Sequence, residues 1–191
     1  MKLILSLLAL TAASAYANPV KRDTPTPEQC DKWRANIGVS HDHFSLACKV
    51  LADACFAKIE TGFSQPWLTH LCVATATCQG TTKTVGIASC IDERIAQANS
   101  SSVGLDPVSQ EVWSGHIETT CNTAPGRCPA SRQQYIDFIY RTLDELDTDS
   151  WPDAQSEVID IWWQSMVDFS GASEDSITFG QFVDFIRNSD S

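Results

Sequence analysis

Apolar residues recur at intervals of three to four positions along most of the chain, which is the spacing of amphipathic helices. After Ser40 they fall on one helical face, formed by Phe44, Cys48, Leu51, Cys55 and Ile59. We therefore expect a helix with Ser40 as its N-cap that runs to about Thr61 and is ended by Gly62. Strand signals are few, so the pattern predicts an all-α fold.

The same periodicity predicts six further helices, and it shows no internal repeat. Their expected ranges are about 64–80, 83–98, 108–120, 135–146, 151–169 and 179–186. Apart from cysteine, His70 is the only ionisable side chain between Pro66 and Cys78, so we expect that helix to be buried on most sides. The last three helices each follow a capping box, at Ser131–Gln134, Ser150–Asp153 and Thr178–Gln181.

The first residues are typical of a secretory signal peptide. Lys2 precedes an apolar run, and Ala15-Tyr16-Ala17 forms a small-x-small cleavage site, so residues 1–17 are predicted to be removed. Lys21-Arg22 is a dibasic processing site that would release residues 18–22 as a propeptide and leave Asp23 as the mature start. We expect the stretch from Asp23 to Glu28 to stay extended because of its prolines. The protein is therefore predicted to be secreted and extracellular.

Cysteine content agrees with an oxidising compartment. The chain has eight cysteines, an even number that predicts four disulfides in a secreted protein. Sequence alone cannot choose among the pairings, and the absence of a CxxC motif argues against thioredoxin-like chemistry and cysteine-type zinc sites. The cysteines are Cys30, Cys48, Cys55, Cys72, Cys78, Cys90, Cys121 and Cys128.

The part of the chain that contains no cysteine is also the more acidic part. Residues 23–128 hold 11 acidic and 7 basic side chains, whereas residues 129–191 hold 13 acidic and 3 basic ones and no cysteine. We expect a disulfide-stapled helical bundle over 30–128, with a Cys-free acidic three-helix segment over 129–191 packed on it. A net charge of −11 is repelled by nucleic acid and anionic lipid. No later apolar run is long enough for a membrane span.

The segment SEDSITFGQFVDFI, residues 173–186, resembles the second half of an EF-hand calcium loop and its exiting helix. If Ile177 takes loop position 8, positions 1, 3, 5 and 12 are Ser170, Ala172, Glu174 and Gln181. Calcium loops need carboxylates at most of these positions. We therefore interpret Thr178 and Gln181 as a helix cap and not as part of a calcium site.

A second acidic stretch, DELDTDSWPDAQSE, precedes the sixth helix. Its carboxylates Asp147, Asp149, Asp153 and Glu157 are the candidate metal ligands of the sequence, with calcium as the cation. Trp151 and Pro152 interrupt the loop pattern, however. The alternative is a helix end and a turn before a new helix, whose N-terminus favours acidic residues. No other cofactor is predicted.

Histidines and hydroxyls offer little for catalysis. Ser40-His41-Asp42 has the letters of a triad, but sequence neighbours cannot form its geometry. His41 and His43 make only a partial metal site. His70 is interpreted as a core residue and His116 as alone on its helix, so no catalytic residue is assigned.

Two further features are predicted. Asn99-Ser100-Ser101 is an N-glycosylation acceptor in an expected loop. Trp162 and Trp163 are adjacent, and helical neighbours point about 100° apart, so their helix is expected to lie between two layers.

The signal peptide, the Lys21-Arg22 site and the eight cysteines together resemble fungal small secreted cysteine-rich proteins. That resemblance implies a protein that acts outside the cell by binding, as an effector on a host or a competitor. Two alternatives stay open: a carrier that holds a lipid or sterol in a helical cavity, and a secreted hydrolase. A large apolar pocket would favour the carrier, and a cleft with a His–carboxylate pair would favour the hydrolase.

Overall fold

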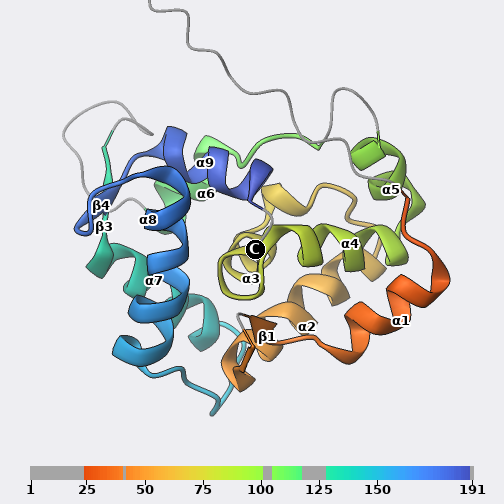
Figure 1. Ribbon diagram of the computed structural model, residues 1–191, viewed down its shortest axis with the longest axis horizontal. Helices are drawn as coiled ribbons and strands as arrows, with labels where there is room; N and C mark the ends of the chain where they lie inside the picture. Colours follow the sequence, from red (N-terminus) through yellow and green to blue (C-terminus); the bar gives the residue numbers. More distant parts are fainter. Residues whose placement is uncertain (1–23, 41, 101–104, 118–127, 190–191) are drawn as a thin grey trace, which may run out of the picture.

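The computed structural model describes residues 24–40, 42–100, 105–117 and 128–189. Within these ranges the chain is helical apart from loops and four two-residue strands, and disulfides link its helices, which confirms the predicted fold class. None of the helices in these ranges has the length and apolar character that a bilayer crossing requires. Figure 1 shows the Cys-rich helices on one side, the last helices on the other, and α3 between them.

The Cys-rich half contains α1 (Pro27–Ala35), α2 (Leu46–Glu60), the 3₁₀ turn η1 (Pro66–Leu68), α3 (His70–Gln79), α4 (Thr81–Ile91) and α5 (Glu93–Ser100). The predicted third helix is broken at Asp92, whose backbone is extended. The predicted second helix is likewise split, because its first turn is η1 and the α-helix begins only at His70.

The first predicted helix begins later than expected. Strands β1 (Val39–Ser40) and β2 (His43–Phe44) pair antiparallel, with Val39 opposite Phe44. Asp42, directly before β2, has a positive φ of 60°. Helix α2 is capped by Ser45, whose hydroxyl accepts a hydrogen bond from the backbone N–H of Cys48, so Ser40 is not its cap.

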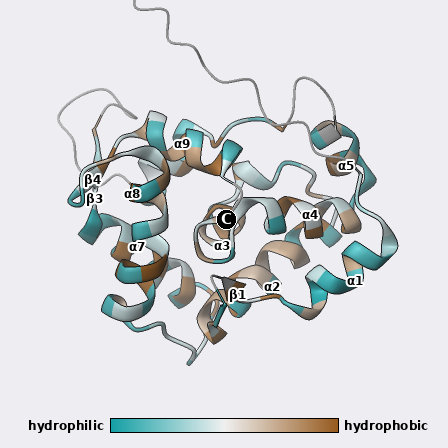
Figure 2. Ribbon diagram, in the orientation of Figure 1, coloured by the Kyte–Doolittle hydropathy of each residue, from teal (hydrophilic) through white to brown (hydrophobic). Residues whose placement is uncertain are grey.

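The N-terminal arm is also more ordered than expected. Helix α1 begins at Pro27, and a capping box of Thr26 and Gln29 starts it. Proline is favoured in the first turn of a helix, where its missing N–H has no intrahelical role. The predicted extended stretch to Glu28 was therefore wrong at its C-terminal end. None of the residues of α1 is buried, and the helix is mostly hydrophilic in Figure 2.

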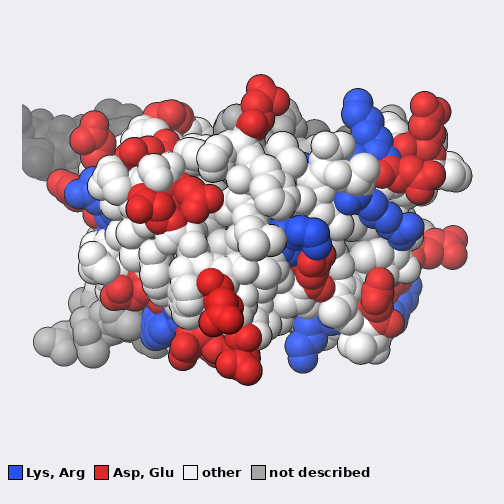
Figure 3. All heavy atoms as spheres, turned by 90° about the horizontal axis from the view of Figure 1, so that it is seen from below, with Lys and Arg blue, Asp and Glu red and all other residues white. Residues whose placement is uncertain are grey.

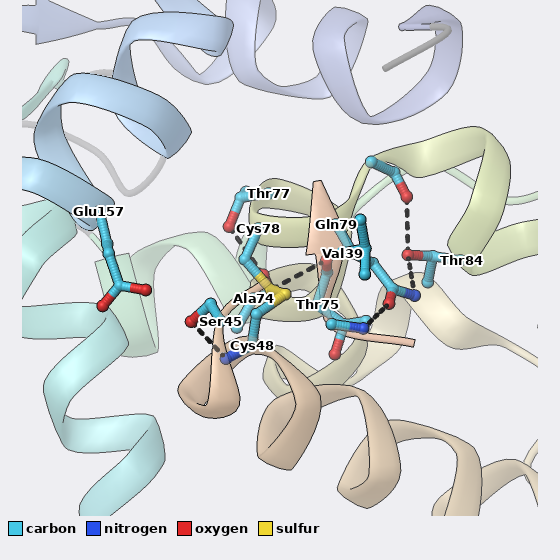
Figure 4. The surroundings of a disulfide bond; sticks show 12 residues. Val39, Ser45, Cys48, Ala74, Thr75, Thr77, Cys78, Gln79, Thr84 and Glu157 are labelled. Atoms are coloured by element: carbon cyan, nitrogen blue, oxygen red, sulfur yellow. Dashed lines mark hydrogen bonds between the residues drawn. A yellow bond between two sulfur atoms is a disulfide. The ribbon is translucent and has the colours of Figure 1, made fainter. Parts of the chain in front are cut away.

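Helix α3 is the centre of the molecule, as its composition predicted. Every residue from Leu71 to Gln79 is buried, and α3 contacts both α2 and α4 of its own half and α7 and α9 of the other. Gly80, with a φ of 95°, turns the chain directly into α4. Buried polar groups are paired here: Gln79 accepts from the N–H of Gly38 and donates to the hydroxyl of Thr84 (Figure 4).

Three disulfides fix this half. Cys48–Cys78 and Cys55–Cys72 both join α2 to α3, and Cys30–Cys90 joins α1 to α4. The first of these pairs lies beside the Ser45 cap in Figure 4. Cys128 is disulfide-bonded as well, and Cys121 lies outside the described residues.

The acidic half contains α7 (Arg132–Asp144), the π-helix η3 (Ala154–Trp163), α8 (Gln164–Ser170) and α9 (Phe179–Asn188). Before it, α6 (Gln110–Val112) and the π-helical turn η2 (Trp113–Ile117) occupy the predicted range 108–120 as far as the chain is described. The capping boxes of α7 and α9 are confirmed. The prediction of Ser150 as the N-cap of the next helix was wrong, because η3 is capped by Asp153.

This half contains a short internal repeat, although the sequence analysis predicted none. Residues 130–139 (ASRQQYIDFI) match residues 177–186 (ITFGQFVDFI) at Gln, Asp, Phe and Ile, with similar residues at three of the six other positions. Both copies start with a strand residue and a capping box: β3 (Ala130–Ser131) precedes α7, and β4 (Ser176–Ile177) precedes α9. The strands pair antiparallel, with Ala130 opposite its own counterpart Ile177.

The two copies of the repeat also make similar aromatic contacts. Trp163 packs on Tyr135 with ring centroids 5.5 Å apart, and Trp113 packs on Phe182, the counterpart of Tyr135, at 5.2 Å. Trp162 and Trp163 are both 1% exposed, so the helix that bears them lies between layers as predicted. The acidic half therefore contains two similar strand-and-helix segments, β3–α7 and β4–α9, and it shares a core with the Cys-rich half.

Candidate interaction surface

An exposed tryptophan stands in the loop between α7 and η3. Trp151 is 45% exposed, although its ring stacks on Tyr140 with centroids 5.7 Å apart. The Tyr140 hydroxyl donates to the carbonyl of Pro152, which is buried, so Tyr140 holds both the indole and the residue that follows it. Proline and the stacked ring restrict this loop, and the exposed aromatic is thus held in a defined place.

Acidic residues flank this tryptophan in the sequence. The segment 144–157 holds six acidic side chains and no basic one. Asp153 is exposed and accepts from the backbone N–H groups of Gln155 and Ser156 and from the Ser156 hydroxyl. Hydrogen bonds from Ser156 hold the pKa of Asp153 below its usual range. Asp153 is thus a fixed negative charge close to the indole.

The β1–β2 hairpin borders the same region from the other half of the molecule. His43 Nε2 lies 3.7 Å from Glu157 Oε1, and the other Glu157 oxygen accepts from the backbone N–H of Asp153. Phe44 and Leu46, which follow His43, are both 54% exposed. We call Trp151 and Tyr140, with the neighbouring carboxylates of Asp153 and Glu157, the Trp151 surface.

Burial raises the pKa of Tyr140 first, and the nearby charges of Asp153 and Glu157 raise it further. The phenol therefore stays neutral and keeps its hydrogen bond to the loop. Figure 3 shows the molecule from below, with mostly acidic groups over the C-terminal half and a mixture of basic and acidic groups over the side of α1. Uncharged side chains occupy much of the area between them.

The candidate calcium ligands have other roles in the fold. Asp153 caps η3, and Glu157 accepts from the Asp153 N–H and lies near His43. Asp147 has a positive φ of 48° in the turn that ends α7, and Asp149 is exposed in the loop. Among the described residues, these four do not form a group of metal-ligating atoms.

The structure brings together two histidines that sequence reasoning had separated. His70, interpreted as a core residue, is partly exposed, and its ring stacks on that of His116. No spacing rule could have found this pair, because 45 residues separate the two side chains and they lie on different elements. His43 is exposed, and His41 lies outside the described residues.

The remaining predicted positions are placed as follows. Asn99 is only 7% exposed at the end of α5, so attaching a glycan would require that turn to open, and glycosylation stays a prediction. The processing site Lys21-Arg22 lies outside the described residues. A surface hollow of about 350 Å³ between α1 and α4 is lined partly by Asp31 and Arg34, which does not suit a lipid.

Comparison of the chain with protein-family models, with curated proteins and with solved structures gave no match.

Proposed function

We propose that this chain is a secreted protein that acts outside the cell by binding another protein, as an effector directed at a host or a competitor. The Trp151 surface supports this proposal best. Tryptophan and tyrosine are the side chains most enriched in the centres of protein interfaces, where they supply large contact areas. An anchored, 45% exposed indole is therefore a better candidate contact than the scattered apolar residues of an ordinary surface.

Charge indicates the chemistry of the partner. Because six carboxylates and no basic group lie in residues 144–157, a partner with clustered Lys and Arg would be attracted and oriented. An arginine or lysine placed over the exposed indole would add a cation–π contact of about 0.5–1 kcal/mol. The proposed partner is therefore a basic extracellular protein surface.

The carrier alternative has less support, because the hollow between α1 and α4 is open and partly charged. The hydrolase alternative gains one observation, the hydrogen bond between His70 and Glu145.

The test uses the disulfide-bonded mature protein and a matched pair of variants. Immobilised protein is exposed to extracellular fluid of the host or competitor, captured proteins are identified by mass spectrometry, and their binding is then measured with purified components. We expect Trp151→Ala to weaken binding at least tenfold and added salt to weaken it further. Phe169→Ala, which removes a 40% exposed aromatic from α8, should leave binding unchanged. A captured partner that is not basic, or binding that Trp151→Ala and salt leave unaltered, would contradict the proposal.

A further inference from the structure

Three potential metal ligands from distant parts of the chain meet at one place. His70 is the first residue of α3, His116 lies in the π-helical turn η2, and Glu145 is the residue that ends α7. One ligand atom of each lies within 4.8 Å of the ligand atoms of the other two. No other group of three histidine, cysteine or carboxylate side chains comes this close in the part of the chain that the structure describes.

His70 contacts both other members of this group without a bound ion. His70 Nε2 lies 2.8 Å from a carboxylate oxygen of Glu145, and the imidazoles of His70 and His116 stack with centroids 4.1 Å apart. Zinc–nitrogen and zinc–oxygen bonds of about 2.0–2.2 Å put the ligand atoms of a tetrahedral ion roughly 3.4 Å apart. Side-chain rotations alone would therefore bring the three atoms around one ion.

The surroundings favour ligation over a chance contact. The His70 side chain is 20% exposed and that of Glu145 52% exposed, so an ion can enter from solvent. Arg141 donates to the carbonyl of His116 and so holds the π-helical turn against α7. Single π-helical turns occur often at functional sites, because the extra residue redirects side chains.

We propose that His70, His116 and Glu145 form a binding site for a divalent transition-metal ion, with zinc as the best fit. Two imidazoles and one carboxylate match the donor set of open zinc sites, which leave the fourth position for water or another ligand. The ion would also tie α3 of the Cys-rich half to η2 and α7. The proposed metal site and the proposed function of the Trp151 surface rest on different residues. Either proposal can therefore be wrong while the other is right.

The experiment titrates ZnCl₂ into the full mature, disulfide-bonded protein at neutral pH, by calorimetry and in competition with a chromogenic chelator. We expect one ion per chain to bind at micromolar protein concentrations and to raise the melting temperature through its affinity for the folded state. Cobalt in place of zinc should give visible absorption bands of a low-coordinate site.

Matched variants locate the site. Glu145→Gln changes a half-exposed side chain without threatening the fold, and should weaken zinc binding at least about tenfold. His116→Ala should abolish the cobalt bands, while His43→Ala, which removes an exposed histidine elsewhere, should change neither reading. The proposal is overturned if zinc fails to bind, if copper binds and zinc does not, or if His43→Ala removes the binding that Glu145→Gln and His116→Ala leave intact.

Discussion

Hydroxyl side chains set where several helices of this protein begin. In the described part of the chain, Thr26, Ser45, Ser109, Ser131 and Thr178 each accept a hydrogen bond from the backbone N–H three residues later. Such a bond pairs one of the N–H groups that a helix start leaves without a partner. The segment that resembles a calcium loop is one of these caps: Thr178 accepts from Gln181, and the Gln181 side chain accepts from the Thr178 N–H.

Thr178→Ala should therefore lower the free energy of unfolding by about 1 kcal/mol, the usual cost of losing a cap. Thermal unfolding followed by circular dichroism measures this change. Ser131→Ala removes the equivalent cap of the repeat and should cost a similar amount, which provides an internal comparison.

Calcium should not alter either value, because Ala172 and Gln181 supply no carboxylate. Calcium binding that Gln181→Ala abolishes would show that our interpretation of this segment is wrong. Binding that survives this change but disappears with Asp147→Ala would place a site in the acidic loop.

At the scale of elements, helix α1 is held by one close contact and one covalent bond. A Cβ atom added at Gly86 of α4 would lie 2.6 Å from the Trp33 ring of α1, so the ring can pack on α4 in this position only because residue 86 has no side chain. Cys30–Cys90 joins the same pair. Periodicity could not reveal this contact, since α1 buries none of its residues.

Gly86→Ala should push the Trp33 ring off α4 and destabilise the protein by about 1–3 kcal/mol, the usual cost of overpacking. Tryptophan fluorescence and chemical unfolding measure the two effects. Gly180→Ala in α9 is the matched control: nothing lies within 4 Å of its added Cβ, so it should be neutral or stabilise by up to about 1 kcal/mol. Equal effects of the two changes would show that Trp33 does not pack as described.

At the scale of the whole molecule, the two halves form one core. Tyr135 of α7 is 1% exposed, and its hydroxyl donates to Thr77 of α3. The Ser189 hydroxyl, after α9, donates to Thr81 of α4 in the same way. Differences in cysteine and charge between the halves therefore do not make them separate folding units, and we expect one cooperative unfolding transition.

The disulfides should nevertheless differ in effect. A loop-entropy model ranks Cys30–Cys90, with a separation of 60 residues, above Cys48–Cys78, with 30. We expect the opposite order after replacing each pair by serine, because α1 is peripheral, whereas Cys48 and Cys78 are fully buried. Loss of Cys30–Cys90 should release α1 alone, seen as fast hydrogen exchange over 27–35 with a small change in melting temperature. A larger drop for that pair than for Cys48–Cys78 would support the entropy model instead.

Local chemistry in the sequence was enough to predict the helical class, the buried character of α3 and the boxes at Ser131 and Thr178, because each depends on residues within a few positions. It missed the start of α2, because Ser40 lies in the β1–β2 hairpin and Ser45 caps the helix instead. It also failed where a neighbour far along the chain decides. The disulfide partners, the Trp33–Gly86 contact and the meeting of His70 with His116 and Glu145 likewise arise only when α1, α3, η2 and α7 pack together, because no local pattern records which distant side chains the packed core brings within bonding distance.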